Sequence, residues 1–477
     1  MTDLRDRLVR KTATPTGGDR STTLAAFLSL LWPGLGQWYL RRRGAALAYA
    51  LPTALAMGAL VWQLGAGLET FALRMLTPTF ALNVLILILL LAIVRIVAML
   101  DAAFWRGPVA GTAPDGHRGR VAVAALTAMI ALVVVSHGAA GYAAFAFYDA
   151  GSKIFIGASD GNGVPGPTDA SATLDPNAFI DREDFQATPD ATPSSASARV
   201  TVLLTGIDSG GNRDHTLTDT LLIVSIDPTT GKVVMVSFPR DIAGFPLYTG
   251  ATYAGRINTL MSAARNDPKR FPDGPLPTLT RELSYLLGVP IHYFAAINLT
   301  GFIQMIDLVG GVDVVNPSVI NDPTYDWLDG TRGFYLRAGK VHLNGRNALG
   351  FVRSRHGAGD SDFTRAANQQ LLLVALRQKL LKPAMILRLP DLLAAASNTV
   401  TTNFPSDRVD QMVALAQSGD PSTIQRLVLG PPYSWHPDTS TTGGAWLLRL
   451  NMDKLAALSV QLFGSDSRYF SAATTSP

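Results

Sequence analysis

Four apolar stretches near the N-terminus limit most strongly what this chain can fold into. They cover residues 24–40, 45–66, 80–99 and 121–147. A helix needs about 20 apolar residues to cross the hydrocarbon core of a bilayer, and the last three stretches reach that length. A mean hydropathy of +0.21 with 16% charged residues is also too apolar for a chain that is soluble throughout its 477 residues. We therefore predict a membrane region over residues 24–148.

The first stretch is the shortest, and Pro33, Gly34 and Gly36 interrupt it. Basic residues precede it in the tail 1–23 and follow it at 41–43. Basic segments favour the cytoplasmic side of a membrane, so a span here would place one of the two on the wrong side. We therefore predict a re-entrant or interfacial segment, followed by three spans. In this topology the protein is a multi-pass protein of the cell membrane, with a cytoplasmic tail and an extracytoplasmic C-terminal part.

The region after the last span has a different composition. Residues 149–198 lose the apolar periodicity and become rich in Pro, Gly, Ser, Thr, Ala and Asp. Such a segment buries too little apolar surface to offset its ordering entropy, so we predict a flexible linker. The chain has no cysteine, which excludes disulfides and thiolate sites. A net charge of +4 without a basic recognition helix does not favour nucleic acid as a partner.

Apolar runs and amphipathic segments alternate after the linker. Strands are expected at residues 200–208, 220–227, 232–237, 292–298 and 312–315, and helices at 258–265, 278–287, 299–308 and 362–381. The sequence DPTTG at 227–231 predicts a hairpin turn. This alternation indicates a layered α/β domain over residues 199–420, with a sheet covered by helices. The pattern alone does not decide between a parallel and a mixed sheet. A loop and a helix over residues 445–463 are expected in the remaining segment, 421–477.

One segment of this domain, FVRSRHGAGDSDFTRAANQQ at residues 351–370, combines arginines with apolar flanks. Asp362, Arg365 and Gln369 are spaced to share one helical face. We predict that Arg353 and Arg355 point the same way from an extended or turn segment just before that helix. The planar fork of a guanidinium matches phosphate oxygens, so converging arginines indicate an anion site. The alternative is a surface helix with ordinary salt bridges.

Further charged residues follow the predicted strands. Asp208 ends the first strand, Asp219 precedes the second, and Arg240 follows the third. Two carboxylates that flank a glycine-rich loop are plausible ligands for Mg²⁺, which takes one or two carboxylates and completes its shell with water and phosphate oxygens. Aspartates at strand ends also cap turns, so the residues alone leave both roles open.

The order of these motifs resembles a known family. L-L-x-G-x-D, T-D-T, S-x-P-R-D, R-I-N and G-F-x-x-x-I-D-x-V-G-G-V occur at residues 203–208, 218–220, 237–241, 256–258 and 301–312, ahead of the arginine segment. Together they resemble the LytR-CpsA-Psr family of cell-envelope phosphotransferases over roughly residues 200–381. With this resemblance, the expected fold is a layered α/β/α extracytoplasmic domain with a central mixed sheet.

The resemblance also implies roles for individual residues. Asp208 and Asp219 would hold a metal ion, Mg²⁺ or Mn²⁺. The residues implied in pyrophosphate binding are Arg240, Arg256, Arg353, Arg355, Arg365 and Gln369, with Asp362 orienting the arginines. Those implied in catalysis are Asp219, Arg240, Arg353 and Arg355, with Asp219 as the candidate base. Leu217 and Asn368 stand where the family commonly has arginine, and Arg256 replaces a frequent lysine.

The implied activity is that of a metal-dependent phosphotransferase. It would move a glycopolymer phosphate from a polyprenyl-pyrophosphate carrier to a peptidoglycan acceptor of the cell wall and form a phosphodiester link. Two alternatives remain open. One is a polyprenyl-pyrophosphate hydrolase that uses water as the acceptor. The other is a membrane protein that binds the lipid pyrophosphate without catalysis and serves in regulation, an alternative for which Leu217 is the one indication.

Overall fold

The computed structural model describes residues 20–65, 67–106, 117–155, 199–208, 217–354, 362–382, 385, 388–397, 399–419 and 423–470. These residues form two compact units. The first is helical and contains residues 1–75 and 79–148, and the second contains residues 76–78 and 149–477. The predicted linker lies outside the described residues from residue 156 onward.

The first unit consists of helices: α2 (Thr22–Leu31), α3 (Leu35–Tyr39), α4 (Arg43–Leu64), α5 (Leu68–Arg74), α6 (Pro78–Ala103) and α7 (His117–Ile154). Among the described residues, the three helices α4, α6 and α7 are long and apolar enough to cross a membrane. They overlap the three stretches for which spans are predicted. Large apolar side chains on them are exposed, including Leu55, Trp62 and Val135. Such surfaces are stable in lipid and costly in water.

Helices α2 and α3 form a tight hairpin in the first apolar stretch. At 1.5 Å per residue, the 10 residues of α2 are about 15 Å long, half the thickness of a bilayer core. Gly34 turns the chain with φ of 103°. The buried Gln37 donates to the carbonyl oxygen of Ala98, over 2.8 Å, and to Asp101 at the end of α6. These contacts attach the hairpin to a neighbouring helix, and the re-entrant or interfacial placement of the segment stays a prediction.

The second unit is built on a mixed sheet of six strands, as predicted from the resemblance. The strand order is β11 (Val400–Thr402), β6 (Tyr293–Asn298), β1 (Val200–Asp208), β2 (Leu217–Ile226), β3 (Val233–Ser237) and β12 (Gln425–Val428). β1 is parallel to β6, and β3 is parallel to β12. The other neighbouring pairs are antiparallel, and the turn predicted at residues 227–231 joins β2 to β3.

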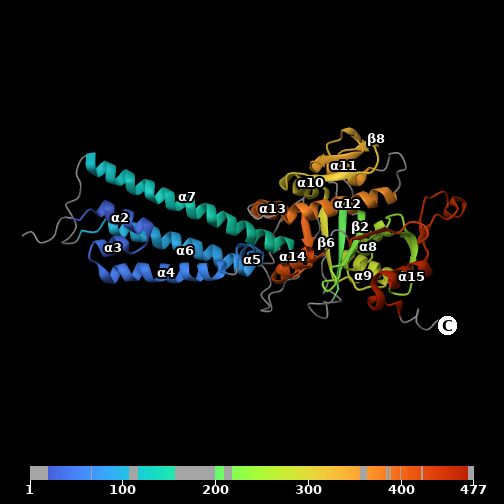
Figure 1. Ribbon diagram of the computed structural model, residues 1–477, viewed down its shortest axis with the longest axis horizontal. Coiled ribbons are helices and arrows are strands. Elements are labelled where there is room, and N and C mark those ends of the chain that lie inside the picture. The colour runs from blue at the N-terminus through green and yellow to red at the C-terminus, as the bar shows by residue number, and fades with distance from the viewer. Residues whose placement is uncertain are drawn as a thin grey trace, which may run out of the picture. The chain divides into compact units, whose positions relative to one another are not determined.

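Helices cover both faces of this sheet (Figure 1). On one face lie α8 (Leu260–Asn266), α9 (Pro275–Leu287) and α15 (Met452–Phe463), which share a large core with Leu203 and Ile223. On the other face lie α12 (Asp362–Leu380) and α14 (Val409–Ser418). All five residues of β3 are buried, as expected for a strand covered on both faces.

A second apolar core lies beside the sheet. It unites α10 (Leu299–Leu308), α11 (Gly345–Arg353) and part of α12 with four further strands, β7 (Val312–Asn316), β8 (Ile320–Asp326), β9 (Arg332–Leu336) and β10 (Gly339–Leu343). β7 was expected among the strands of the domain, but it pairs with β10 in a separate ribbon and not with the main sheet. Edge-to-face contacts of Tyr325 and Phe334 with Trp327 fill this core.

The C-terminal part completes the same unit. The sequence suggested only a loop and a helix after residue 421, yet β12 joins the sheet and α15 packs into its core. The last helix begins at Met452 and not at Ala445, because Leu448 forms a bridge with Ile242 and Asn451 caps the helix. The remaining elements of the described residues are two ribbons and five short helical segments. The ribbons are β4 (Ala243–Pro246) with β5 (Thr252–Arg256) and β13 (Ser434–Trp435) with β14 (Arg449–Leu450). The helical segments are η2 (Ile257–Thr259), α13 (Leu389–Ala396), η4 (Ser406–Arg408), η6 (Thr439–Thr442) and η7 (Gly464–Asp466).

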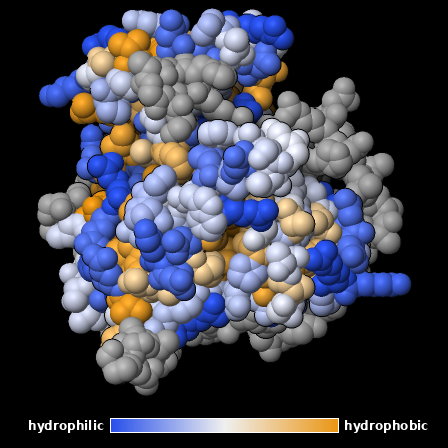
Figure 2. Space-filling model, turned by 90° about the vertical axis from the view of Figure 1, so that its right-hand side faces the viewer, coloured by the Kyte–Doolittle hydropathy of each residue, from blue (hydrophilic) through white to orange (hydrophobic). Residues whose placement is uncertain are grey.

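The surface on the α15 side is mostly hydrophilic, with small groups of hydrophobic residues between the polar ones (Figure 2). This distribution is ordinary for a domain in water. It differs from the exposed leucines, valines and tryptophans on the helices of the first unit.

Candidate active site

A cavity of about 590 Å³ lies between the sheet and the helices α10, α11 and α12. Its polar lining includes five residues for which the sequence predicts a role: Asp219, Arg240, Arg353, Arg365 and Gln369. Its apolar lining includes Leu204, Leu222, Ile297, Phe302, Met305 and Leu376. One continuous space therefore combines an arginine cluster with a hydrophobic wall.

A β-bulge directs Asp219 into this cavity. Gly206 pairs with Thr220, and Ile207 pairs with Thr218, so Asp219 has no partner across the ladder. An extra residue of this kind bends a strand and redirects its side chain. As a result, two consecutive residues of β2, Asp219 and Thr220, line the same cavity. Regular alternation would place them on opposite faces.

Asp219 is held by arginine. Nη1 of Arg240 lies 2.6 Å from its Oδ1, and both side chains are largely buried. Burial raises the pKa of the Asp219 carboxyl, but the positive charges of Arg240, Arg365 and Arg353 outweigh it, and the net pKa is lowered. The Asp219 carboxylate is therefore ionised at neutral pH and is a weak base.

Two further carboxylates link the remaining arginines. Nη2 of Arg365 lies 2.9 Å from Oδ1 of Asp362, and Nε of Arg256 lies 3.3 Å from Oδ1 of Asp241. Nε of Arg240 lies between them, 3.8 Å from Asp241 and 3.9 Å from Asp362. Burial, a hydrogen bond with Asp362 and the negative charge of Asp362 raise the pKa of Asp241 to about 6. The two carboxyls thus share a proton when Asp241 is protonated.

Arg353 reaches the cavity from a position that differs from the expected one. It is the last residue of α11, not part of an extended or turn segment. The helix forms because Asn344 caps its first turn and because Ala348, Leu349, Phe351 and Val352 bury one face. Ser354 then ends the helix.

The sequence did not single out the residues that hold this helix end. Oγ of Ser354 donates to the buried Asp322 over 3.0 Å. Asp322 also lines the cavity, next to Tyr325. Burial raises the pKa of Tyr325, while the charge of Arg353 and a hydrogen bond with it act against that rise. Asp322 is three elements away from the arginine segment in the chain, so no local spacing could have indicated the contact.

The predicted register of α12 agrees with the structure. Asp362, Arg365 and Gln369 succeed one another along one side of the helix, and the last two line the cavity. Gln369 donates to the carbonyl oxygen of Val352 over 3.3 Å. Asn368 is buried and donates to the carbonyl oxygen of Phe351, so it joins α12 to α11 and does not face an anion.

The other predicted site residues are placed as follows. Arg256 and Asp362 contact the cavity arginines through Asp241 and Arg365, but they do not line the cavity. Asp208 ends β1, where its backbone pairs with Leu217, and its side chain lies outside the described part of the chain. Arg355 also lies outside the described residues.

The implied metal ion can be tested against the donors present. Within the described residues, no group of three His, Cys, Asp or Glu side chains could hold a metal. Asp208 pairs with Leu217, two residues before Asp219 on the adjacent strand, so the two aspartates stand at the same end of the sheet. A pair of carboxylates fits Mg²⁺ when phosphate oxygens and water supply the other ligands. The metal site stays a prediction, because the side chain of Asp208 lies outside the described part of the chain.

These features define a class of protein: an α/β domain that follows apolar helices and carries an arginine-lined anion cavity with a hydrophobic wall. The model of the LytR_cpsA_psr family matches residues 170–468, well over half of the chain. The chain belongs to that family.

The sequence identity to individual relatives is low. The polyisoprenyl-teichoic acid–peptidoglycan teichoic acid transferase TagU of Bacillus cereus is 28% identical over 218 residues, which are 46% of this chain and 64% of the relative. The TagU of Oceanobacillus iheyensis is 30% identical over 218 residues, 45% of this chain and 62% of the relative. The matched region thus spans less than two thirds of these relatives. The crystal structure of B. subtilis TagV has 22% sequence identity and a TM-score of 0.45, and the match covers 58% of this chain and 98% of that one.

Proposed function

We propose that the protein transfers a glycopolymer phosphate from a polyprenyl-pyrophosphate carrier to a peptidoglycan acceptor of the cell wall. The observation that carries this proposal is the single cavity in which an arginine cluster meets an apolar wall. A lipid-linked pyrophosphate has the same two parts, a doubly charged head and a hydrophobic chain. Membership of the family and the transferase names of the relatives support the same activity.

The arginines supply the charge that phosphoryl transfer needs. The acceptor hydroxyl attacks the phosphorus that bears the glycopolymer, the bond from that phosphorus to the bridging oxygen breaks, and polyprenyl phosphate leaves. Negative charge then builds up on the bridging oxygen and on the oxygens of the departing phosphate. Arg240, Arg353 and Arg365 are fixed on three different elements around the cavity and stabilise this charge without rearrangement.

Asp219 is our candidate for two roles. As an ionised carboxylate on the cavity wall, it would hold a divalent cation together with Asp208. When bound, such a cation would neutralise phosphate charge and lower the pKa of the acceptor hydroxyl. Asp219 is also the candidate to take the proton of that hydroxyl. Its lowered pKa makes it a better ligand than base.

The apolar wall would bind the polyprenyl chain of the carrier. Leu204 and Leu222 come from the sheet, and Phe302, Met305 and Leu376 come from the facing helices. Each buried methylene group of an isoprenoid contributes about 0.8 kcal/mol. The wall therefore favours long chains over short ones. The three apolar helices keep the domain close to the membrane in which such a carrier resides. We infer a multi-pass anchor with the α/β unit on the extracytoplasmic side.

The test is an assay with the full-length protein in lipid nanodiscs. The substrates are Mg²⁺, a sugar linked to a short polyprenyl pyrophosphate, and a peptidoglycan oligomer, and the products are read by mass spectrometry. The expected product is an oligomer that carries the sugar through a phosphodiester, and it disappears with EDTA.

Two other results would overturn the proposal. Release of the sugar phosphate into water in the presence of the acceptor identifies a hydrolase. Tight binding of the lipid without turnover, with and without Mg²⁺ or Mn²⁺, identifies a binding protein.

A further inference from the structure

A second cavity, of about 750 Å³, lies at the other end of the sheet. β1 and β6 are parallel, and the candidate active site is built from the later residues of both strands. The second cavity instead contains His292, which directly precedes β6. Its lining also includes Tyr248, Thr280, Ser284, Tyr285 and Arg468. Pockets of about 300–1,000 Å³ are typical for small organic ligands.

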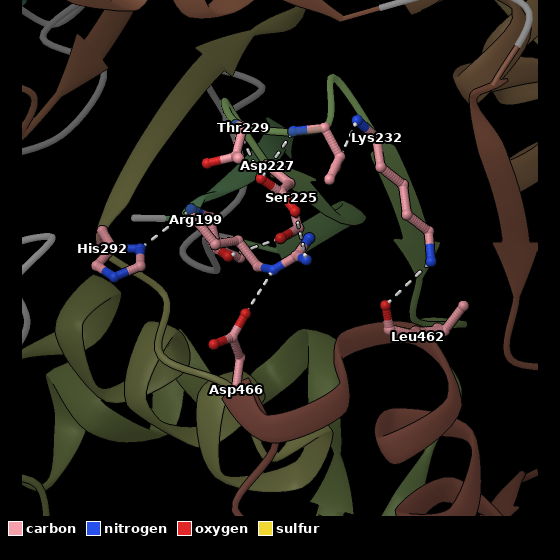
Figure 3. A network of polar contacts seen from close by, with 10 residues as sticks. Arg199, Ser225, Asp227, Thr229, Lys232, His292, Leu462 and Asp466 are labelled. Carbon is pink, nitrogen blue, oxygen red and sulfur yellow. Dashed lines mark hydrogen bonds and ion pairs between the residues drawn. The ribbon is translucent and has the colours of Figure 1, made fainter. Parts of the chain in front are cut away.

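A polar network fixes one wall of this cavity to the sheet (Figure 3). Arg199 lies 2.9 Å from Asp466 and 3.4 Å from Asp227, so it joins the segment after α15 to the turn between β2 and β3. Lys232 donates to the carbonyl oxygen of Leu462 over 3.3 Å. These contacts tie the end of α15 and the following η7 (Gly464–Asp466) to the sheet. The cavity is therefore a preformed part of the fold.

His292 contributes a hydrogen-bond donor to the lining. Its Nδ1 accepts from the backbone N–H of Thr201 over 3.0 Å, so the neutral ring carries its proton on Nε2. Burial lowers the pKa of His292 and thereby keeps the ring neutral, while the hydrogen bond from Thr201 acts in the opposite direction.

Arg468 supplies a positive charge that forms no salt bridge with a carboxylate of the described residues, although it interacts electrostatically with the buried Glu282. Its guanidinium carbon lies 3.9 Å from the centre of the Tyr285 ring and 4.7 Å from that of Tyr469. Nη2 donates to the hydroxyl of Tyr469 over 2.8 Å, and that hydroxyl donates to the carbonyl oxygen of Leu286. Tyr285 also forms a side-chain hydrogen bond with the guanidinium, so both tyrosines hold the fork in place.

The backbone of this segment is equally well fixed. The N–H of Arg468 donates to the carbonyl oxygen of Gly288 over 2.8 Å. Gly288 has φ of 79°, and a Cβ at this position would lie 2.3 Å from the Tyr469 ring. The close approach of the two chain segments thus requires glycine, and it holds the guanidinium at the cavity.

The other charged groups of the lining are neutralised. Arg281 lies 2.6 Å from Asp273, and Asp466 lies 2.9 Å from Arg199. Glu282 is fully buried beneath this wall, and burial raises its pKa to about 7, although the N–H of Tyr248 and the charge of Arg468 act against the rise. The cavity therefore presents one positive charge without a salt bridge among hydroxyl groups and tyrosine rings, with Glu282 only partly ionised behind it at neutral pH.

We propose that this second cavity binds an anionic saccharide, with Arg468 on the acidic group and the serine, threonine and histidine groups on sugar hydroxyls. Hydroxyl-rich ligands need many short donors and acceptors, and the apolar faces of sugar rings pack on tyrosine and proline. The choice of a saccharide rests on the proposed function. Either polymer of that reaction has the required chemistry, a glycan strand with carboxylates or a donor chain with phosphates.

Such a site would act at a distance from the reaction centre. It would hold a remote part of a long polymer, and remote binding raises kcat/KM for long substrates without contact to the reacting atoms. Loss of the site would then leave turnover of short substrates unchanged.

The experiment measures saccharide binding and not turnover, so its result does not depend on whether the proposed transferase activity is correct. The full-length protein in nanodiscs is titrated by calorimetry with a carboxylate-bearing muropeptide tetrasaccharide, a neutral chitin tetrasaccharide, and a short oligomer of sugar phosphates. Arg468→Gln removes the charge but keeps a side chain between the two rings. Arg468→Lys keeps the charge but loses the planar fork. Arg426→Gln, on exposed β12, is the matched control.

We expect binding of one or both anionic probes, no binding of the neutral probe, and a loss of about tenfold in affinity in Arg468→Gln. Arg468→Lys should fall between that variant and the wild type, and Arg426→Gln should equal the wild type. The probe that binds identifies the polymer. Equal affinity for the neutral probe, no binding of any probe, or unchanged binding in Arg468→Gln overturns the proposal. Unchanged binding of the lipid pyrophosphate by Arg468→Gln establishes that the variant is folded.

Discussion

Carboxylates hold Arg240 and Arg365 in the first cavity, whereas aromatic rings hold Arg468 in the second. Arg240 and Arg365 lie 2.6 and 2.9 Å from Asp219 and Asp362, whereas Arg468 lies between Tyr285 and Tyr469. A carboxylate aligns a guanidinium strongly but cancels its charge. A ring aligns it more weakly and leaves the charge available. The first arrangement suits a site that must hold several arginines close together, and the second suits a single anion contact.

The difference between arginines held by carboxylates and an arginine held by rings should have its largest effect on the free energy of unfolding. Arg365→Ala removes a cation that is only 5% exposed and leaves the carboxyl of Asp362 without it. Breaking a buried ion pair costs about 3–5 kcal/mol. Loss of an exposed contact between a cation and a ring, in Arg468→Gln, costs about 1 kcal/mol or less. Denaturant unfolding of the full chain in detergent, followed by tryptophan fluorescence, measures both. Equal losses would contradict the distinction between the two environments.

The second largest effect is expected on turnover, which should fall with a substitution in the first cavity and not with one in the second. Arg353→Ala is expected to lower kcat on the order of 100- to 1,000-fold, because it removes charge from the site of the departing phosphate. Saccharide binding at the second cavity should not change. In Arg468→Gln, kcat with a short substrate should stay unchanged, and saccharide binding at the second cavity should weaken. The measurement is steady-state transfer in nanodiscs, with Arg426→Gln as the control. A variant that impairs both activities equally would indicate misfolding or a single shared site.

The two cavities should also differ in their response to pH. The pKa of Asp241 is raised to about 6, so the Asp241–Asp362 pair loses its shared proton as the pH rises through 6. The added negative charge opposes anion binding. Affinity for a prenyl diphospho-sugar, whose phosphates stay singly charged in this range, should therefore fall by up to about tenfold between pH 5 and 7, the equivalent of one pKa unit.

Asp241→Asn should flatten this pH profile, and binding at the Arg468 cavity should show no step near pH 6. The same raised pKa makes the folded unit less stable as the pH rises from the ordinary aspartate value toward 6. An unaltered step in Asp241→Asn would show that another group titrates.

The smallest expected effect is on the affinity for the prenyl carrier, and it comes from a change in the apolar wall of the first cavity. Met305→Gln keeps the length of the side chain but places an amide against the lipid. Affinity for a long prenyl carrier should fall about threefold to tenfold, since an unpaired amide in an apolar site costs about 1 kcal/mol or more. Affinity for a very short prenyl chain should stay the same. Met412→Gln, on α14 outside both cavities, is the matched control. Equal losses for both chain lengths would exclude a lipid contact at Met305.

Local sequence patterns predicted much of the first site. The spacing of Asp362, Arg365 and Gln369 indicated their common side of α12, and the strand end indicated Arg240. Asp219 was expected just before the second strand, but it lies inside β2, at the bulge. The position of Arg353 was wrong because tertiary burial extends α11 up to that residue. The second cavity had no local signal, since Tyr248, Tyr285 and Arg468 come together only in the folded chain. β12 was missed because a strand of four residues at a sheet edge has too few positions to show alternation.

The bulge in β2 makes the active site sensitive to a change in the length of this strand. A strand presents its side chains alternately to the two faces of a sheet, and the extra residue at position 219 shifts this alternation by one step. Deletion of one residue here would restore regular pairing and bring Asp219 opposite Ile207, which faces the core of α8 and α9. The ladder would become continuous, and the carboxylate would turn away from the arginines. At this position the chain length itself is a functional property, and a shorter strand would be more regular and inactive.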